Sequence, residues 1–366
     1  MAKIVIDARE LGATGTGTYL RHLLEELQAI DLDNSYRVLL KPKDMDSWQP
    51  SNRKFKKVSC RYKEFSFGEQ LGLWKQLREL RADLVHFAMV QQPILYPGKV
   101  VTTMHDLTTA RFRNPAKNWL IFTIKQQVYK LVNYWAAHKS NLIITDTEYV
   151  KDDVAKFARI NSRKIEVIYL AADPITAKSE PYDQLIDKPF IMYVGRPQPH
   201  KNLDRLIDAF ALIRQTNPNL RLVLAGKKDV LYRRLKKLAD LRGIKNVVFT
   251  GFVSESQLRW LYENTSAYVF PSLSEGFGLP GLEAMAAGAP VASSRATCLP
   301  EIYKDAAVYF DPLDVEEMAN TITNVISDEK LRKHLVARGK TVASSYSWRR
   351  MAQQTLEAYK RVLGQD

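Results

Sequence analysis

Short runs of apolar and β-branched residues alternate with amphipathic stretches along most of the chain. In the first half, strand-like runs fall at 3–7, 36–41, 83–87, 99–104, 141–145 and 165–169. Helical periodicity predicts helices between them, at 16–29, 68–81, 115–138 and 147–158. This alternation is typical of parallel sheets built from β-α-β units.

A second series of the same kind begins at residue 189. It predicts strands at 189–195, 220–225, 246–250, 266–270, 290–293 and 307–310. The helices of this series are expected at 202–215, 229–242, 255–263, 279–287, 314–327 and 329–343. Residues 171–188, with Pro174 and Pro181, are typical of a linker, and a last helix at 347–363 has no strand after it.

The expected fold class is α/β, with two doubly wound Rossmann-like domains that face a central cleft. We place the domains at 1–178 and 187–346, and we expect the C-terminal helix of 347–366 to pack back towards the first domain. In doubly wound sheets, ligands bind at the carboxyl ends of the strands. Candidate functional residues should therefore follow the predicted strands.

The composition is that of a soluble globular protein, since 46% of the 366 residues are hydrophobic and 26% are charged. The start of the chain lacks the features of a secretory signal, and no apolar run is long enough to cross a membrane. The two cysteines, Cys60 and Cys298, suggest neither a disulfide framework nor a metal cluster. We therefore expect a cytoplasmic protein.

The formal net charge of +14 favours polyanionic partners. Six basic and no acidic residues lie in 53–63, and no Asp or Glu lies between Asp106 and Asp146. The segment 111–139 is both basic and rich in aromatic residues. Together with the basic run 53–63 it predicts peripheral binding to an anionic membrane surface at the inner face of the cell membrane. The alternative is a solvated basic face with its aromatic residues in the core, and an exposed loop at 53–63.

The stretch SLSEGFGLPGLEAMAAGAPV (272–291) carries two glutamates, Glu275 and Glu283, on either side of a glycine-rich turn. Pro280 suits the first turn of a helix, whose free N–H groups and positive dipole end can bind a diphosphate. Glu283, about one turn into the helix, can accept hydrogen bonds from ribose hydroxyls, and Glu275 can reach a sugar. The alternative is a surface helix with two unrelated glutamates.

The motif GRPQPHKN (195–202) follows the first strand of the second series. Arg196 can make a forked contact to phosphate oxygens, and Lys201 adds a point charge. Fixed cations at this place lower the barrier to departure of a diphosphate leaving group. The alternative is two solvated surface charges.

Two further segments follow strands of the first series. In VVTTMHDLT (100–108), His105 and Asp106 come at the end of an apolar strand. After the first strand, Gly12, Gly15 and Gly17 form a flexible segment that leads into a helix. A structural histidine and a plain strand–helix turn are the alternatives.

Together these motifs resemble the family 4 retaining glycosyltransferases (glycosyl transferases group 1), which have the GT-B fold. The resemblance extends from about 189 to 315 and includes YVGRPQPHKN, EGFGLPGLE and DAAVYFDPLD. It implies a nucleotide diphosphate sugar as donor, no metal and no other cofactor. The donor contacts that it implies are made by Gly15, Gly17, Arg196, Lys201, Glu275, Gly276, Phe277, Gly278, Leu279 and Glu283.

For catalysis the resemblance assigns roles to His105, Glu275, Arg196 and Lys201. The histidine contacts the donor sugar, and retention proceeds by same-face attack, in which an oxygen of the leaving phosphate takes the proton of the acceptor. The expected enzyme is a hexosyltransferase that moves a sugar, with some preference for mannose, to a glycan or a lipid-linked acceptor in cell-surface polysaccharide or glycolipid synthesis.

Two positions depart from the family pattern. Gly281 stands where many members have a second proline, and Tyr303 with Lys304 stand where a glycine before the Asp is common. We expect these differences to affect the shape of the loop rather than the chemistry.

Three other classes of protein share some of these features. A dinucleotide-dependent oxidoreductase needs GxGxxG and an acidic residue about 20 positions later, which the first β-α turn does not have. A basic nucleic-acid-binding protein would account for the charge, but the chain has no recognisable binding module, and we expect no nucleic-acid partner. A GT-B phosphorylase would need bound pyridoxal phosphate and is usually a longer chain.

Overall fold

In the computed structural model the chain divides into two compact units, and the structure describes residues 1–113 and 119–365. The first unit consists of Met1–Arg111, Leu120–Leu170 and Ser347–Asp366, and the second is built mainly from Ala171–Tyr346. The expected linker therefore belongs with the second unit from its first residue. Arg259 fastens it there, because its guanidinium donates to the carbonyls of Ile175 and Ala177 at 3.4 and 3.0 Å.

The first unit contains a parallel sheet of seven strands among the described residues, in the order β3-β2-β1-β4-β5-β6-β7. Its strands are β1 (Lys3–Asp7), β2 (Ser35–Leu40), β3 (Phe55–Ser59), β4 (Leu84–Phe87), β5 (Val100–Thr103), β6 (Leu142–Thr145) and β7 (Ile165–Val167). All residues of β4 and β5 are buried. Strands covered on both faces read as continuous apolar runs, which is why the sequence identified six of the seven.

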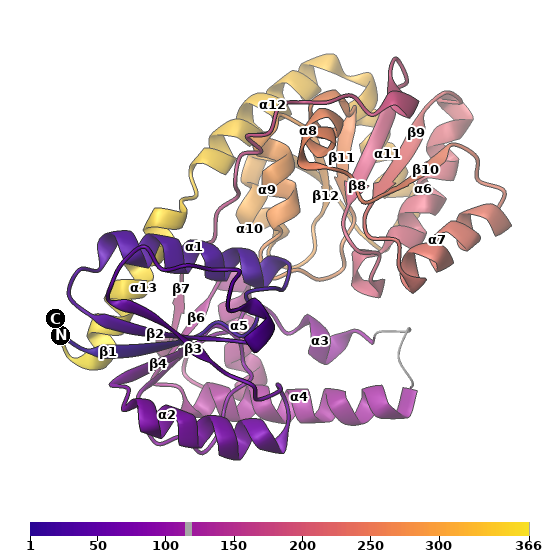
Figure 1. The fold of residues 1–366 in the computed structure, drawn as a ribbon. Helices are drawn as coiled ribbons and strands as arrows, with labels where there is room; N and C mark the ends of the chain where they lie inside the picture. The colour runs from indigo at the N-terminus through magenta and orange to yellow at the C-terminus, as the bar shows by residue number, and fades with distance from the viewer. Residues whose placement is uncertain (114–118, 366) are drawn as a thin grey trace. The chain divides into compact units, whose positions relative to one another are not determined.

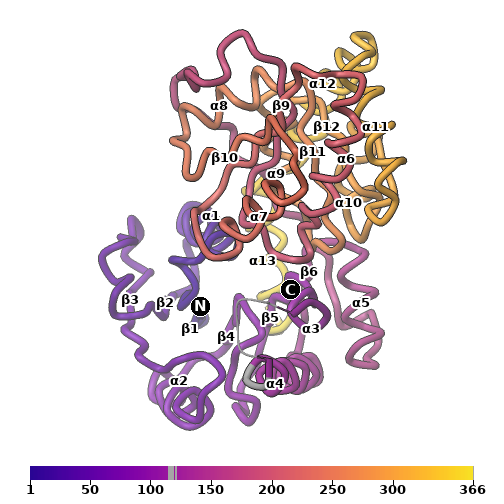
Figure 2. Tube along the Cα trace, turned by 90° about the vertical axis from the view of Figure 1, so that its right-hand side faces the viewer, coloured from indigo at the N-terminus to yellow at the C-terminus, as the bar shows by residue number. Residues whose placement is uncertain are grey.

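Helices cover both faces of this sheet. Figure 1 shows α1 (Gly15–Ile30) and α13 (Trp348–Leu363) on one side, and α2 (Trp74–Leu80) and α4 (Trp119–Lys139) on the other. The unit also contains α3 (Thr108–Arg111) and α5 (Glu148–Ala158), and the predicted start of α4 at 115 lies outside the described residues. The last helix packs on α1, where the rings of His22 and Trp348 stack with centroids 4.3 Å apart. Both chain termini therefore belong to the first unit (Figure 2).

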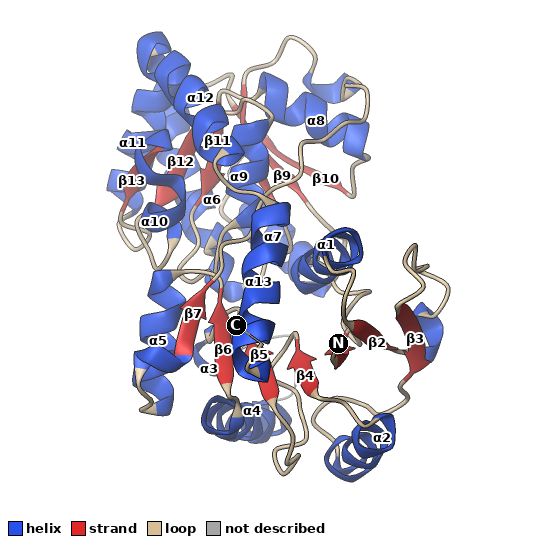
Figure 3. Cartoon of the chain, turned by 90° about the vertical axis from the view of Figure 1, so that its left-hand side faces the viewer, coloured by secondary structure: helices blue, strands red, loops and turns tan. Residues whose placement is uncertain are grey.

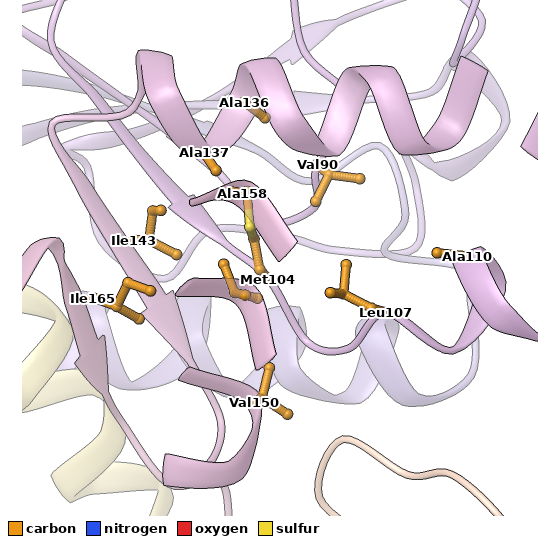
Figure 4. Packing of buried hydrophobic residues seen from close by; sticks show 11 residues of the cluster. Val90, Met104, Leu107, Ala110, Ala136, Ala137, Ile143, Val150, Ala158 and Ile165 are labelled. Carbon is orange, nitrogen blue, oxygen red and sulfur yellow. The ribbon is translucent and has the colours of Figure 1, made fainter. Parts of the chain in front are cut away.

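Small residues bring α4 and α5 close to the first sheet. Ala136 and Ala137 of α4 and Ala158 of α5 pack in one buried cluster with Ile143 and Ile165 of the strands (Figure 4). Alanine side chains leave little space between helix and sheet, so the interior stays closely packed. This packing fixes the carboxyl ends of β5 and β6, where candidate functional residues begin.

The second unit contains a parallel sheet of six strands among the described residues, in the order β10-β9-β8-β11-β12-β13. Its strands are β8 (Phe190–Val194), β9 (Arg221–Ala225), β10 (Val247–Gly251), β11 (Ala267–Phe270), β12 (Val291–Ser294) and β13 (Ala307–Phe310). The helices are α6 (Leu203–Thr216), α7 (Val230–Leu241), α8 (Glu255–Asn264), α9 (Leu279–Ala286), α10 (Leu299–Tyr303), α11 (Val315–Ser327) and α12 (Glu329–Ser344). Figure 3 shows the strands of each sheet running between layers of helices.

Both sheets reverse their strand order at one point. The reversal lies between β1 and β4 in the first sheet and between β8 and β11 in the second. Ligands of doubly wound sheets bind at the carboxyl ends of the strands beside such a switch point. The prediction of two doubly wound Rossmann-like units is confirmed.

The basic run 53–63 is not an exposed loop, and that alternative was wrong. Its residues Phe55–Ser59 form the edge strand β3, and Phe55 is buried against Tyr36 with ring centroids 4.2 Å apart. Lys57 donates to the carbonyl of Met45 at 2.7 Å. Charged side chains on an edge strand discourage pairing with another chain, so this run has a structural role.

Candidate active site

The glycine-rich turn of the second unit connects β11 to α9, directly beside the switch point. The helix begins at Leu279, after Gly278, whose φ of +94° is a conformation that suits glycine. Pro280 lies in the first turn, as predicted. Gly276 and Phe277 precede it and are buried, and the ring of Phe277 packs edge-on against Tyr346 at 5.6 Å. The N–H groups of this helix start are the predicted diphosphate contacts.

Lys201 and Glu275 meet in the same place, from the loops that follow β8 and β11. Lys201 Nζ lies 2.6 Å from Glu275 Oε1, and the two side chains are 19% and 11% exposed. The ammonium also lies 5.6 Å from the centre of the Phe270 ring. A ligand with a negative charge can replace Glu275 as the partner of Lys201, and a ligand that donates hydrogen bonds can replace Lys201 as the partner of Glu275.

Asn202 holds these two loops together, although the sequence interpretation did not include it. Its side-chain amide donates to the carbonyl of Pro271 at 3.1 Å and to that of Pro312 at 2.7 Å. The main chain adds a bond from Leu273 N–H to the His200 carbonyl at 2.7 Å. The motif shows that a polar residue follows Lys201, but it does not show that the side chain of this residue is buried. The role of Asn202 could therefore not be predicted from the sequence.

Arg196, in contrast, pairs with Asp229 rather than with Glu275. Its Nε lies 2.5 Å from Asp229 Oδ2, and the Arg196 side chain is 50% exposed. Asp229 caps α7 by accepting the N–H groups of Leu231 and Tyr232. Burial alone would raise the pKa of Asp229, but the hydrogen bonds from Tyr232 N–H and Arg196 lower it below its ordinary value. The half-exposed Arg196 side chain is accessible to an anion from solvent.

Glu283 lies one turn into α9 and is partly buried. Burial, with a smaller contribution from the charge of Asp173, raises the pKa of its carboxyl group to about 7. A carboxylate that burial has partly dehydrated favours ligands that donate hydrogen bonds to it. Ribose hydroxyls are donors of this kind.

In the first unit, His105 follows β5 and Asp146 follows the neighbouring strand β6. His105 Nδ1 lies 2.8 Å from Asp146 Oδ2, and the side chains are 16% and 3% exposed. The Tyr19 ring packs edge-on against the imidazole at 5.0 Å. Burial on its own would lower the pKa of His105, but the charge of Asp146 and the hydrogen bond to it raise it above the ordinary value. The sequence interpretation missed Asp146, although it comes directly after an apolar strand.

Asp106, next to His105, has a structural contact, because its carboxylate accepts the N–H of Thr108 at 2.8 Å at the start of α3.

Gly15 and Gly17 lie in the first turn of α1 rather than in a loop before it, so the predicted loop is shorter than expected. A Cβ on Gly17 would lie 2.5 Å from the Leu11 carbonyl oxygen, whereas one on Gly15 would meet nothing within 4 Å. Gly17 is required for packing, and Gly15 leaves open space at the start of the helix.

The chain has two Rossmann-like units. One unit carries a lysine, two glutamates and a glycine turn at its switch point, and the other carries a histidine–aspartate pair. These are the features of a GT-B glycosyltransferase. Residues 176–342 match the family model Glycosyl transferases group 1, and residues 13–175 match Glycosyltransferase Family 4. The chain belongs to this family of glycosyltransferases, which also decides against the oxidoreductase and nucleic-acid-binding classes.

Individual relatives agree with this assignment. The chain is 30% identical over 284 residues to the O-antigen chain mannosyltransferase B of Escherichia coli, covering 72% of this chain and 70% of that protein. It is 31% identical over 281 residues to the longer serotype-specific mannosyltransferase WbdA of Escherichia coli, of which the match spans 34%. Among solved structures, HepE of Anabaena in complex with UDP and glucose shares the fold, with a TM-score of 0.74, 18% identity and coverage of 98% of this chain and 100% of that one.

Proposed function

We propose that the enzyme transfers a hexose, with mannose preferred, from a nucleotide diphosphate sugar to a glycan or lipid-linked acceptor. The second unit binds the donor and the first unit binds the acceptor. The observation that carries this proposal is the convergence of Lys201, Glu275 and the start of α9 at the switch point of the second sheet. The names of the relatives support mannose and O-antigen chains as the class of product.

In the proposed complex, the diphosphate takes up the cations of Arg196 and Lys201 together with the N–H groups of Gly276, Gly278 and Leu279. Glu283 accepts hydrogen bonds from the ribose. On binding, the phosphate replaces Asp229 as the partner of Arg196, and Lys201 shares its charge between Glu275 and the leaving group. Positive charge fixed in advance stabilises the negative charge that develops on the diphosphate, so the proposed mechanism needs no metal.

The bond between the anomeric carbon and the phosphate oxygen breaks as the acceptor oxygen attacks from the same face. The acceptor proton passes to an oxygen of the leaving phosphate, so that configuration is retained and no covalent enzyme intermediate forms. His105, held by Asp146, contacts the sugar, as does Glu275. Gly15 and Gly17 are the proposed donor contacts at the start of α1, where a Cβ on Gly15 would meet nothing within 4 Å.

We propose further that the first unit associates with an anionic membrane through α4. Ile124, Val128, Leu131 and Trp135 recur at spacings of four, three and four residues and are all at least 41% exposed. Such spacing puts them on one face of the helix, and the same helix has lysines but no acidic residue. The proposed mode is surface binding from the cytoplasm through this exposed face. No helix among the described residues is long and apolar enough to span a bilayer.

A donor panel tests the proposed reaction. Purified enzyme is incubated with GDP-mannose and with UDP-hexoses in the presence of EDTA, and the released nucleotide is measured. We expect turnover or slow hydrolysis of one donor. Replacing Lys201 or Glu283 by Ala should reduce the rate at least 100-fold, while the exposed controls Lys237→Ala and Glu316→Ala retain it. Near-normal rates in both site variants would contradict the assignment.

A further inference from the structure

The two departures from the family pattern meet in space beneath the glycine turn. Tyr303 ends α10 and is fully buried, and its hydroxyl donates to the Gly278 carbonyl at 2.6 Å. A Cβ on Gly281 would lie 2.2 Å from the Tyr303 hydroxyl oxygen and 2.4 Å from its Cζ atom. The glycine at 281 is therefore required by the tyrosine at 303.

The same side chain also accounts for the glycine at 278. A Cβ there would lie 2.5 Å from the Tyr303 hydroxyl, and the φ of +94° would in addition strain any larger residue. The Gly278 carbonyl accepts a second bond, from Gly281 N–H at 3.1 Å. With both lone pairs occupied, this carbonyl is held beneath the turn, and the turn keeps one conformation.

Tyr303 cannot move aside to make room for a larger residue at 281. Its ring packs against Phe270 with centroids 6.3 Å apart, and Phe270 is the residue over which Lys201 lies. Burial, with a smaller contribution from Glu275, raises the pKa of the Tyr303 hydroxyl well above its ordinary value, so it remains a donor at every working pH. The buried Phe270 ring therefore lies between Tyr303, which holds the glycine turn, and Lys201.

We infer that Tyr303 is a positioning residue for the donor diphosphate. It fixes the turn at Gly278 so that the N–H groups at the start of α9 stay in the arrangement that binds phosphate, and Gly281 is its matched partner. This inference rests on the proposed function of the same turn. It adds a main-chain contribution to diphosphate binding beside the side-chain cations of Arg196 and Lys201, which are held in ion pairs with Asp229 and Glu275.

The test compares two tyrosines that each lose one hydrogen bond to a carbonyl. Tyr303→Phe removes the bond to Gly278, and Tyr309→Phe removes the bond from Tyr309 to the Lys304 carbonyl, which is also 2.6 Å long. Binding of UDP and of GDP is measured by calorimetry well below the melting temperature. We expect the Kd of the preferred nucleotide to rise about ten-fold in Tyr303→Phe and less than two-fold in Tyr309→Phe.

A double-mutant cycle gives a second reading. Gly281→Ala should raise the Kd at least ten-fold in the wild-type chain, and less than two-fold in a Tyr303→Leu background, where the clashing ring atoms are gone. Equal effects in both backgrounds, or a normal Kd in Tyr303→Phe, would overturn this inference alone. A wild-type enzyme that binds neither nucleotide would overturn the proposed function as well. Should Tyr303→Leu fail to fold, the comparison of Tyr303→Phe with Tyr309→Phe still tests the role of Tyr303.

Discussion

Lys201 and Glu275, which are 74 residues apart in the chain, form an ion pair of 2.6 Å at the carboxyl ends of β8 and β11. Each side chain is less than one fifth exposed. The carboxylate neutralises the ammonium, so in the proposed complex a diphosphate competes with Glu275 for Lys201. We therefore expect the pair to limit how tightly the leaving nucleotide is held.

Glu275→Gln should separate binding from catalysis. Loss of the negative charge frees Lys201, so we expect the Kd of the nucleotide diphosphate product to fall several-fold. The rate of sugar transfer should fall at least ten-fold, because Glu275 is proposed to contact the sugar. Calorimetry and a steady-state assay measure the two effects, and Glu255→Gln, on the exposed start of α8, is the control. A parallel loss of both affinity and rate would count against this role.

The raised pKa of Glu283 predicts a dependence of donor binding on pH. The carboxylate form accepts ribose hydrogen bonds best, so affinity should increase as the pH rises from 6 to 8 through the pKa of about 7. We expect the Kd of an intact nucleotide sugar, whose phosphates do not titrate in this range, to fall several-fold. Glu283→Gln should show little change over the same range. A pH profile identical in both proteins would exclude Glu283 as the titrating group.

The raised pKa of Glu283 also predicts that the protein becomes less stable as the pH rises, whereas donor binding becomes tighter. The folded-state pKa of about 7 lies above the ordinary value of 4.5, so the folded protein favours the neutral acid. The penalty for the buried charge is absent below pH 4.5, grows between 4.5 and 7, and is complete above 7. Because the Glu283 side chain is partly exposed, we expect this penalty to lower the free energy of unfolding by about 1–2 kcal/mol. Glu283→Gln should therefore raise the melting temperature at pH 8 and not at pH 4.5, with Glu316→Gln as control.

The pair of His105 and Asp146 predicts a catalytic defect without a binding defect. Asp146→Asn removes the charge that raises the pKa of His105, and burial then lowers that pKa. We expect a loss of about ten-fold in kcat and a downward shift of the His105 titration followed by NMR, at an unchanged Kd for the nucleotide. Asp152→Asn, on the exposed face of α5, should leave all three quantities unchanged. A nucleotide Kd that rises as much as kcat falls would contradict the separate roles of the two units.

The exposed face of α4 predicts lipid binding that depends on charge. Leu131→Glu should reduce co-sedimentation with phosphatidylglycerol-containing vesicles at least ten-fold, because it places an anion in the apolar stripe next to the lipid surface. Leu313→Glu, in the second unit, changes an equally exposed leucine and should have no effect. Binding of the wild-type protein to pure phosphatidylcholine should be weak. Equal binding of both variants would argue that the stripe serves another contact.

The sequence predicted the sheets well because parallel strands are buried on both faces and stand out as apolar runs. It missed β3, since the edge strand FKKVS is too charged to look like a strand. Residues that follow strands, such as Arg196, Glu275 and His105, were predictable from the rule that ligands bind at strand ends. Asp146 also follows a strand, so the same rule could have found it. The pairing of Asp146 with His105 and of Asp229 with Arg196 was not predictable, because these contacts depend on the register of neighbouring strands and loops.

The relation of Gly281 to Tyr303 shows a similar limit. Both positions were recognised as departures from the family pattern, and a change in the shape of the loop was expected. That the two departures compensate each other could not be inferred, because 22 residues separate them and their contact depends on how α9 and α10 pack against β11. A pairing of this kind becomes visible only when side-chain distances are known.

In the proposed function, the second unit binds a nucleotide diphosphate at the carboxyl ends of β8 and β11. The most direct measurement is a crystal structure of the enzyme with the UDP or GDP that matches its preferred donor. We expect the diphosphate within hydrogen-bonding distance of Lys201, Arg196 and the first N–H groups of α9, with the ribose at Glu283. Nucleotide bound elsewhere, or density that leaves Lys201 paired with Glu275 and Arg196 paired with Asp229 without phosphate contacts, would contradict it.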